Sequence, residues 1–118
     1  MSTELVLDPA STTPPYEQIR EQLRDLIQVG RLEPGVRLPP VRQLAADLGI
    51  APGTVARAYK ELEEEHLLIT RRGAGTTVAE TQIDRAAVLR ARAESYVAHG
   101  RSLGFSDAEL RAGLNEAF

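Results

Sequence analysis

The sequence predicts a mainly α-helical protein with one small β-hairpin, and three stretches of the chain predict it. Residues 38–62 contain two short amphipathic helices joined at a glycine. Two β-prone runs then flank a glycine-rich loop at residues 71–75, and two further helical patterns follow from residue 82. This order is typical of a winged helix-turn-helix domain followed by a pair of helices. The expected segments are an N-terminal arm (1–13), a winged helix-turn-helix domain (14–80) and a two-helix dimerisation region (81–118).

The two helices of residues 38–62 follow from apolar spacing and from proline and glycine. The first is expected over Pro39–Leu48 and the second from Pro52, because proline suits the first position of a helix. Gly49 stands between them, where a helix end favours a residue that tolerates a left-handed backbone. The residues expected to be buried recur at helical spacing: Val41, Leu44, Ala45 and Leu48, then Val55, Ala58, Tyr59 and Leu62. The second helix therefore presents Arg57 and Lys60 outward, as a helix that reads DNA would.

A longer helix precedes this pair. It is expected to begin near residues 14–15, with Thr13 as its N-cap, and to end at Gly30. Pro34-Gly35 predicts a type II turn, and residues 36–38 are expected to form a short strand that leads into the helix pair. The apolar stripe of the long helix consists of Tyr16, Ile19, Leu23, Leu26 and Ile27.

A β-hairpin is predicted after the second helix of the pair. Ile69-Thr70 and Thr76–Val78 supply its strands, and the loop between them contains two glycines. A hairpin directly after a helix-turn-helix is the wing of a winged-helix domain. Its tip carries Arg71 and Arg72, and its glycines allow the backbone to approach a sugar-phosphate strand closely.

The C-terminal segment is expected to form two helices that mediate dimerisation. The first is expected over Gln82–His99 and ends at Gly100 or Gly104, and a capping box of Ser106 and Glu109 starts the second. Large apolar patches on small domains mark interfaces. The residues expected at the dimer interface are Leu89, Tyr96, Leu103, Phe105, Leu110, Leu114 and Phe118. The alternative is that these helices fold back onto the chain's own first helix.

Composition narrows the classes of function. The chain has 118 residues, a net charge of −3 and no cysteine, which excludes disulfides and thiolate sites and fits a cytoplasmic protein. No apolar run is long enough to span a membrane, and the N-terminus lacks the pattern of a secretory signal, so no membrane partner is expected. Residues 34–60 nevertheless contain four basic residues and one acidic residue. A local positive surface of this kind is compatible with DNA binding, although such charges can also be simply solvated.

No catalytic, metal or cofactor site is predicted, and the chain is not expected to be an enzyme. His66 and His99 lie in separate elements without further ligands, and Lys60 is expected on an exposed face without a pocket that would tune its amine. The glutamates of residues 61–65 are expected to continue a helix into solvent, where no pocket supports acid–base chemistry. The three tyrosines lie on apolar stripes and are expected in the core or at an interface: Tyr16, Tyr59 and Tyr96.

Five short motifs follow one another along the chain: PPYEQI at Pro14–Ile19, GRLEPGVRLP at Gly30–Pro39, VRQLAADLGI at Val41–Ile50, TVARAYKEL at Thr54–Leu62 and RRGAGTTV at Arg71–Val78. In order and spacing they resemble the GntR family of bacterial transcription regulators over about residues 14–79, and the short two-helix tail resembles its YtrA-type subfamily. The resemblance implies a homodimeric repressor that binds a roughly palindromic double-stranded DNA operator. It also implies control of a transporter operon and, commonly, of the regulator's own gene. No residue set marks a small-molecule effector, so its existence and chemical class stay open.

The resemblance also implies which residues contact DNA. The matching positions are Arg42, Thr54, Arg57, Arg72 and Gly73. The basic residues around them complete the predicted DNA-binding surface: Arg37, Lys60 and Arg71.

The sequence departs from the family at the start of the second helix. Pro40 stands where the family usually has serine, and Ala51-Pro52-Gly53 replaces residues that are commonly polar. Base discrimination is therefore expected to rest on Arg57, Lys60, the wing and DNA shape. This bare helix start and the net acidity favour one alternative function, a winged-helix module that binds protein instead of DNA.

Overall fold

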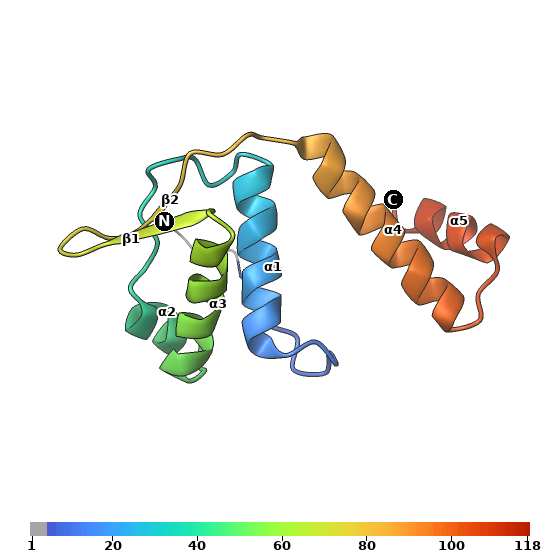
Figure 1. Cartoon of the computed structure of the whole chain (residues 1–118). Coiled ribbons are helices and arrows are strands. Elements are labelled where there is room, and N and C mark those ends of the chain that lie inside the picture. The colour runs from blue at the N-terminus through green and yellow to red at the C-terminus, as the bar shows by residue number, and fades with distance from the viewer. Residues whose placement is uncertain (1–4) are drawn as a thin grey trace. The chain divides into compact units, whose positions relative to one another are not determined.

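The computed structural model describes residues 5–118, along which five helices and one two-stranded hairpin follow one another (Figure 1). The chain divides into two compact units, one up to Ile83 and one over Asp84–Phe118. This mainly helical fold with a small hairpin confirms the predicted fold class. The elements are α1 (Pro15–Gln28), α2 (Val41–Leu48), α3 (Pro52–Glu64), β1 (Leu68–Arg71), β2 (Gly75–Val78), α4 (Arg85–Ser102) and α5 (Asp107–Glu116).

Helix α1 begins at Pro15, within the predicted range, but without the predicted side-chain cap. Pro14 occupies the N-cap position with φ −59° and ψ 149°, and its carbonyl accepts the backbone N–H of Gln18 at 3.1 Å. The prediction of Thr13 as N-cap is therefore wrong. Two prolines follow Thr13 and favour an extended backbone before the helix, which moves the cap one residue along the chain. The helix ends before Gly30, whose φ of 83° is left-handed.

The described part of the predicted N-terminal arm is held against α1 by two glutamine side chains. Val6 N–H donates to Gln22 Oε1 at 3.0 Å, and Gln22 Nε2 donates back to the Val6 carbonyl at 2.8 Å. Gln18 Oε1 accepts the N–H of Asp8 at 2.8 Å. Leu5 is buried in the core, so the arm from this residue onward packs as part of the domain. Residues 1–4 lie outside the described residues.

Helices α2 and α3 form the predicted pair around Gly49, whose φ of 68° is left-handed. Helix α3 begins at Pro52 as predicted, and its buried residues are those predicted: Val55, Ala58, Tyr59 and Leu62. Helix α2 begins at Val41, two residues later than predicted. Because a proline follows Pro39, that residue is held extended, and Pro40 with ψ 150° becomes the N-cap.

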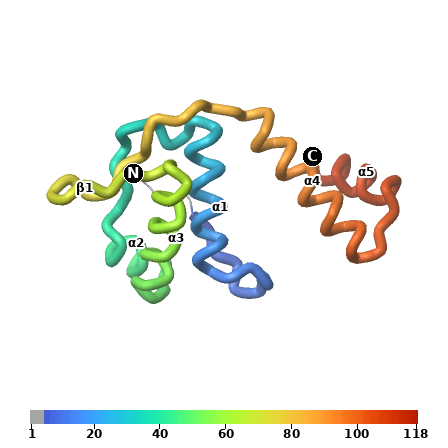
Figure 2. Tube along the Cα trace, in the orientation of Figure 1, coloured from blue at the N-terminus to red at the C-terminus, as the bar shows by residue number. Residues whose placement is uncertain are grey.

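The core of the first unit lies between α1, α2, α3 and the hairpin. Figure 2 shows α1 and α3 running side by side. Each of these helices has side chains that are fully buried in the core. The hydroxyl of Tyr59 donates to the Pro39 carbonyl at 2.8 Å, which ties α3 to the segment before α2, and burial raises the pKa of Tyr59. The largest fully buried side chains are Ile19, Leu23, Ile27, Leu44, Val55 and Leu62.

The hairpin is an antiparallel pair in which Leu68 lies opposite Val78. The strand predicted at residues 36–38 is only a single bridge, between Arg37 and Thr77. Its backbone is nonetheless paired, because Leu38 N–H donates to the Thr76 carbonyl at 2.8 Å. The Pro34-Gly35 turn before it and two prolines after it leave room for no longer strand.

The second unit is a hairpin of two helices, which we call the helical tail. Helix α4 starts at Arg85, three residues later than predicted, because Asp84 caps it by accepting the N–H of Ala87 at 3.0 Å. Of the two predicted ends, Gly104 is the one observed, with φ 90°, whereas Gly100 lies inside the helix. Helix α5 carries the predicted capping box. No helix in the described residues has the length and apolar character needed to cross a membrane.

Candidate nucleic-acid interface

The outer face of α3 carries the predicted cations. Arg57 and Lys60 are exposed, Thr54 is half-buried, and Gly53 is exposed in the first turn. The first turn therefore offers no long polar side chain, which agrees with the departure from the family at Ala51-Pro52-Gly53. A first turn of small residues leaves the backbone of α3 open to close approach by a partner.

Arg42 and the wing supply further positive charge. Arg42 is exposed on α2, and Arg71 and Arg72 are exposed at the tip of the hairpin, where Gly73 turns the chain with φ 84°. Within the described residues, neither these three arginines nor Lys60 forms an ion pair. Their charge is thus available to an anionic partner such as a phosphate backbone.

The side chain of Arg37 lies against the wing. Its guanidinium packs against Gly75, next to the turn of the wing, where a Cβ on that glycine would come within 2.9 Å of Arg37 Nε. Gly75 also has a φ of 74°, a left-handed backbone that favours glycine at this position. Arg37 is exposed, so its side chain contacts the wing and still presents its charge to solvent.

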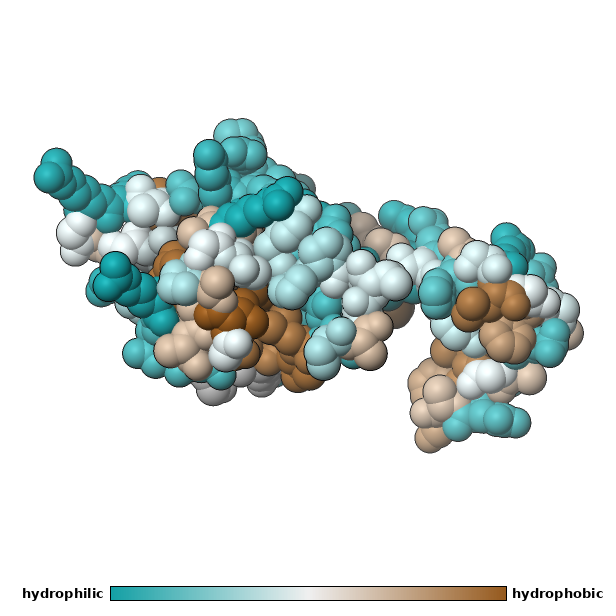
Figure 3. Space-filling model, turned by 90° about the horizontal axis from the view of Figure 1, so that it is seen from below, coloured by the Kyte–Doolittle hydropathy of each residue, from teal (hydrophilic) through white to brown (hydrophobic). Residues whose placement is uncertain are grey.

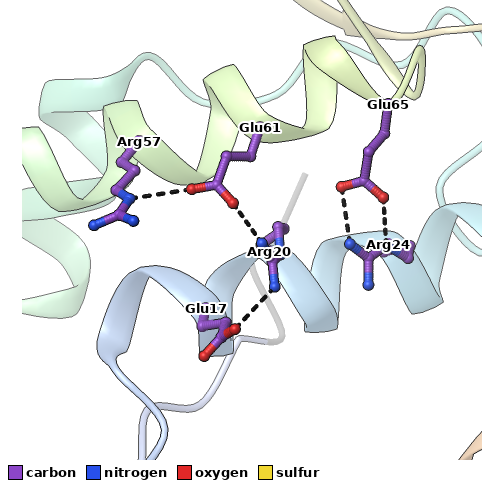
Figure 4. Close-up of polar contacts among 6 residues, drawn as sticks. All are labelled: Glu17, Arg20, Arg24, Arg57, Glu61 and Glu65. Carbon is purple, nitrogen blue, oxygen red and sulfur yellow. Dashed lines mark hydrogen bonds and ion pairs between the residues drawn. The ribbon is translucent and has the colours of Figure 1, made fainter.

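Arg57 is held by residues from two helices. Its Nε donates to Glu61 Oε2 at 3.1 Å, and its guanidinium carbon lies 3.6 Å from the centre of the Tyr16 ring. The other Glu61 oxygen accepts from Arg20 of α1, whose Nη2 lies 3.1 Å from Glu17 (Figure 4). We call these five residues the α1–α3 charge cluster.

The charge cluster differs from what the spacing predicted. Glu61 was expected in solvent, but it lies between two guanidinium groups. Partial burial alone would raise its pKa, but hydrogen bonds from Arg57 and Arg20 outweigh that effect and hold the pKa of Glu61 below its ordinary value. Tyr16 lies on the expected apolar stripe of α1, yet its ring face stacks on a cation. The i, i+4 spacing of Arg57 and Glu61 was a usable signal for their pairing, whereas nothing in the sequence paired either with Tyr16.

The helical tail presents most of the apolar residues predicted for dimerisation. Leu110 differs from them, because it is only 6% exposed and packs onto Gly100 of α4, with the Tyr96 hydroxyl donating to its carbonyl at 2.6 Å. Beside this contact lies a groove of about 470 Å³, lined mainly by apolar residues of α4 and α5. Figure 3 shows apolar side chains gathered on this unit. The exposed members of the predicted set are Leu89, Tyr96, Leu103, Phe105, Leu114 and Phe118.

The comparisons with known proteins agree with this geometry. A family model described as bacterial regulatory proteins, gntR family, matches residues 15–78. The HTH-type transcriptional repressor YtrA of Bacillus subtilis is 49% identical over 74 residues, which cover 63% of this chain and 57% of that repressor. The chain thus spans little more than half of that relative. An HTH-type transcriptional regulator of Mycobacterium tuberculosis is 41% identical over 105 residues, covering 89% of this chain and 86% of that protein.

Solved structures include proteins that match nearly the whole chain. YtrA from Sulfolobus acidocaldarius, a GntR-family transcription factor, has a TM-score of 0.61 at 29% identity and covers 95% of this chain and 94% of its own. The DNA-binding domain of AraR in complex with operator ORX1 has a TM-score of 0.56 at 30% identity, covering 64% of this chain and 93% of its own.

Proposed function

This chain belongs to the gntR family of bacterial regulatory proteins and is a DNA-binding transcriptional regulator, and we propose that it acts as a homodimeric repressor. In a dimer, each copy would place its helix α3, the recognition helix, on one half-site of a roughly palindromic operator. The two half-sites would lie about one helical turn of DNA apart, or a multiple of it. The working compartment is then the bacterial cytoplasm, where the chromosome lies. The regulated genes are, in this proposal, a transporter operon and the regulator's own gene.

The observation that best supports DNA binding is a set of unpaired cations on one domain of a chain that is acidic as a whole. Arg42, Lys60, Arg71 and Arg72 are exposed on α2, α3 and the wing without ion-pair partners in the described residues. By contrast, Glu61 of α3 and Glu65 at the C-cap of α3 are each paired with an arginine of α1. Two of the four carboxylates in residues 61–65 are thus paired with cations, so the net charge of −3 does not describe this surface.

Dimerisation is proposed to use the helical tail. Its exposed large apolar residues lie beside an apolar groove, and grouped apolar residues on a surface mark interaction sites. A second tail could cover them and so set the distance between two recognition helices. A small molecule that altered this packing would act as an inducer, and we propose no chemical class for it.

The decisive experiment is a salt titration of binding to duplex DNA. Each phosphate contact adds about one unit to the slope of log K against log salt, so Arg42→Ala and Arg72→Ala should each reduce that slope by about one. Arg90→Ala removes an exposed cation from α4, outside the predicted DNA surface, and is the matched control with an unchanged slope. Binding that does not respond to salt in the wild-type protein would refute the function. Selection of genomic fragments with the purified protein would then identify the operator.

A further inference from the structure

We propose that Tyr16 and Glu61 are positioning residues that orient Arg57 to read a guanine in the operator. The inference rests on the proposed function and deepens it, because it assigns specificity to one side chain and names the two residues that hold it. Neither Tyr16 nor Glu61 belongs to the predicted DNA-binding surface.

The contacts of Arg57 leave one edge of its guanidinium free. The Nε–H is occupied by Glu61 at 3.1 Å, and one face of the plane is covered by the Tyr16 ring at 3.6 Å. The terminal nitrogens Nη1 and Nη2 form no hydrogen bond or ion pair with any described residue, and the side chain is 60% exposed. An arginine carries five N–H donors in a planar fork, so the remaining edge presents two parallel donors. That edge matches two acceptors lying side by side, such as guanine O6 and N7.

Fixing the orientation of the Arg57 guanidinium before DNA binds improves its discrimination between bases. A free arginine side chain loses rotamer entropy on binding and can swing between a base and a phosphate. Stacking on Tyr16 fixes the plane, and the bond to Glu61 fixes its rotation within that plane. Glu61 is in turn held by Arg20, and Arg20 by Glu17, so the support reaches back to α1 (Figure 4). The same contacts offset the negative charge of Glu61, which would otherwise repel the DNA backbone.

The location of Arg57 favours a base over a phosphate. It is the sixth residue of α3, counted from Pro52, on the exposed face of the helix that enters the major groove in this fold. The residues before it, Ala51-Pro52-Gly53, carry no side chain long enough to compete for the same base edge. Arg42 and the wing supply unpaired cations for phosphates, so Arg57 is the arginine whose geometry is constrained.

The charge cluster has a matched control in the same helix pair. Arg24 Nε and Nη2 of α1 donate to both oxygens of Glu65, the C-cap residue of α3, at 3.0 and 2.8 Å. This pair also bridges α1 and α3, one turn further along α3, but it does not contact Arg57 (Figure 4). If Glu61 merely braced the two helices, Glu61→Ala and Glu65→Ala would have the same effect on DNA binding.

The test is a binding-site selection with the full chain, followed by affinity measurements on single-base variants of the selected operator. We expect one guanine per half-site whose replacement by adenine weakens wild-type binding by about 10-fold or more. Arg57→Gln should abolish this preference, and Tyr16→Leu and Glu61→Ala should reduce it to about 3-fold or less, while preferences at other positions stay unchanged. Tyr16→Phe keeps the ring face and should keep the preference, as should Glu65→Ala.

Three results would overturn the inference. The first is a guanine preference that survives Arg57→Gln, and the second is an equal loss at every base position in Glu61→Ala, which would indicate a phosphate contact. The third is an equal effect of Glu61→Ala and Glu65→Ala. Failure of the proposed function looks different, because the wild-type protein would then select no sequence at all. Thermal unfolding of each variant identifies any that fail to fold. If a Glu61 or Arg57 variant fails to fold, the test rests on whether Tyr16→Leu loses the guanine preference that Tyr16→Phe keeps.

Discussion

Glu61 illustrates how one carboxylate can take its role from two helices at once. Its two oxygens accept from Arg57 on α3 and from Arg20 on α1. A carboxylate that accepts charged donors is favoured in its ionised form, which is why its pKa lies below the ordinary value despite partial burial. Protonation of Glu61 should therefore cost the folded state more than it costs the unfolded chain.

This shift predicts a pH dependence of stability with a definite sign. Because the folded-state pKa is lowered from 4.5, the stabilisation is fully present above pH 4.5 and is lost as the pH falls through the folded value. The free energy of unfolding of Glu61→Gln should therefore lie below that of the wild type near neutral pH, and the two should converge in acid. Chemical denaturation at a series of pH values measures this, and a difference that grows in acid would contradict it.

A single glycine can also determine how two helices pack, and Gly100 is an example. Gly100 lies inside α4, where glycine ordinarily weakens a helix. A Cβ there would come within 2.1 Å of Leu110 Cδ2, so the absence of a side chain is what allows α5 to pack closely on α4. The glycine that looked like a helix end is thus a packing contact.

At the scale of elements, helix α5 depends on its capping box. Ser106 Oγ accepts the N–H of Glu109 at 3.1 Å, and Glu109 Oε1 accepts the N–H of Ser106 at 3.0 Å. These bonds satisfy two backbone donors that a helix start leaves without partners. Arg101 of α4 adds a bidentate ion pair to Asp107 in the first turn.

Ser106→Ala should loosen α5 without unfolding the rest of the chain. Losing an N-cap hydroxyl costs about 1 kcal/mol, which corresponds to about 5-fold faster amide exchange in this helix if it opens locally. Hydrogen exchange followed residue by residue measures this effect. Ser102→Ala is the control, because that hydroxyl bonds only to the His99 carbonyl in the last turn of α4. Equal exchange of α5 amides in both variants would argue against the cap.

At the scale of the whole molecule, the two units have unequal cores. Among the described residues, Leu110 is the only buried apolar residue that lies beyond Ile83. The first unit contains a core drawn from α1, α2, α3 and the hairpin, whereas the helical tail leaves most of its large apolar side chains exposed. A unit with so little buried surface is expected to gain stability from association.

A chain that ends after Ile83 should therefore remain folded but lose dimerisation. We expect a monomer that binds the operator at least about 10-fold more weakly, because two half-sites are no longer engaged together. Sedimentation and operator titration measure both effects. Leu89→Glu in the full chain should also weaken dimerisation, because it places a charge on the exposed apolar surface of α4. This substitution leaves the first unit unchanged. A truncated chain that still sediments as a dimer would disprove the role of the tail.

The sequence alone determined the features that depend on neighbouring residues. Prolines at the first positions of α1 and α3, glycine after α2 and serine before α5 limit the local backbone, so these boundaries were predictable. Helical spacing also identified the buried face of α3. The start of α2 was predicted two residues too early, because two consecutive prolines are compatible both with the start of a helix and with an extended segment before it. The misplaced N-cap of α1 has the same origin.

Tertiary structure decided which of these faces meet and what the exposed residues contact. Tyr16 and Arg57 lie 41 residues apart in the chain, and only the packing of α1 on α3 brings the ring beneath the guanidinium. The same holds for Arg20 with Glu61 and for Gly100 with Leu110. Periodicity assigns a residue to a face of its own helix, but the partner of that face depends on how helices pack. For this reason the pairing of Arg57 with Glu61 had a signal in the sequence, whereas the contacts that these two residues make with α1 had none.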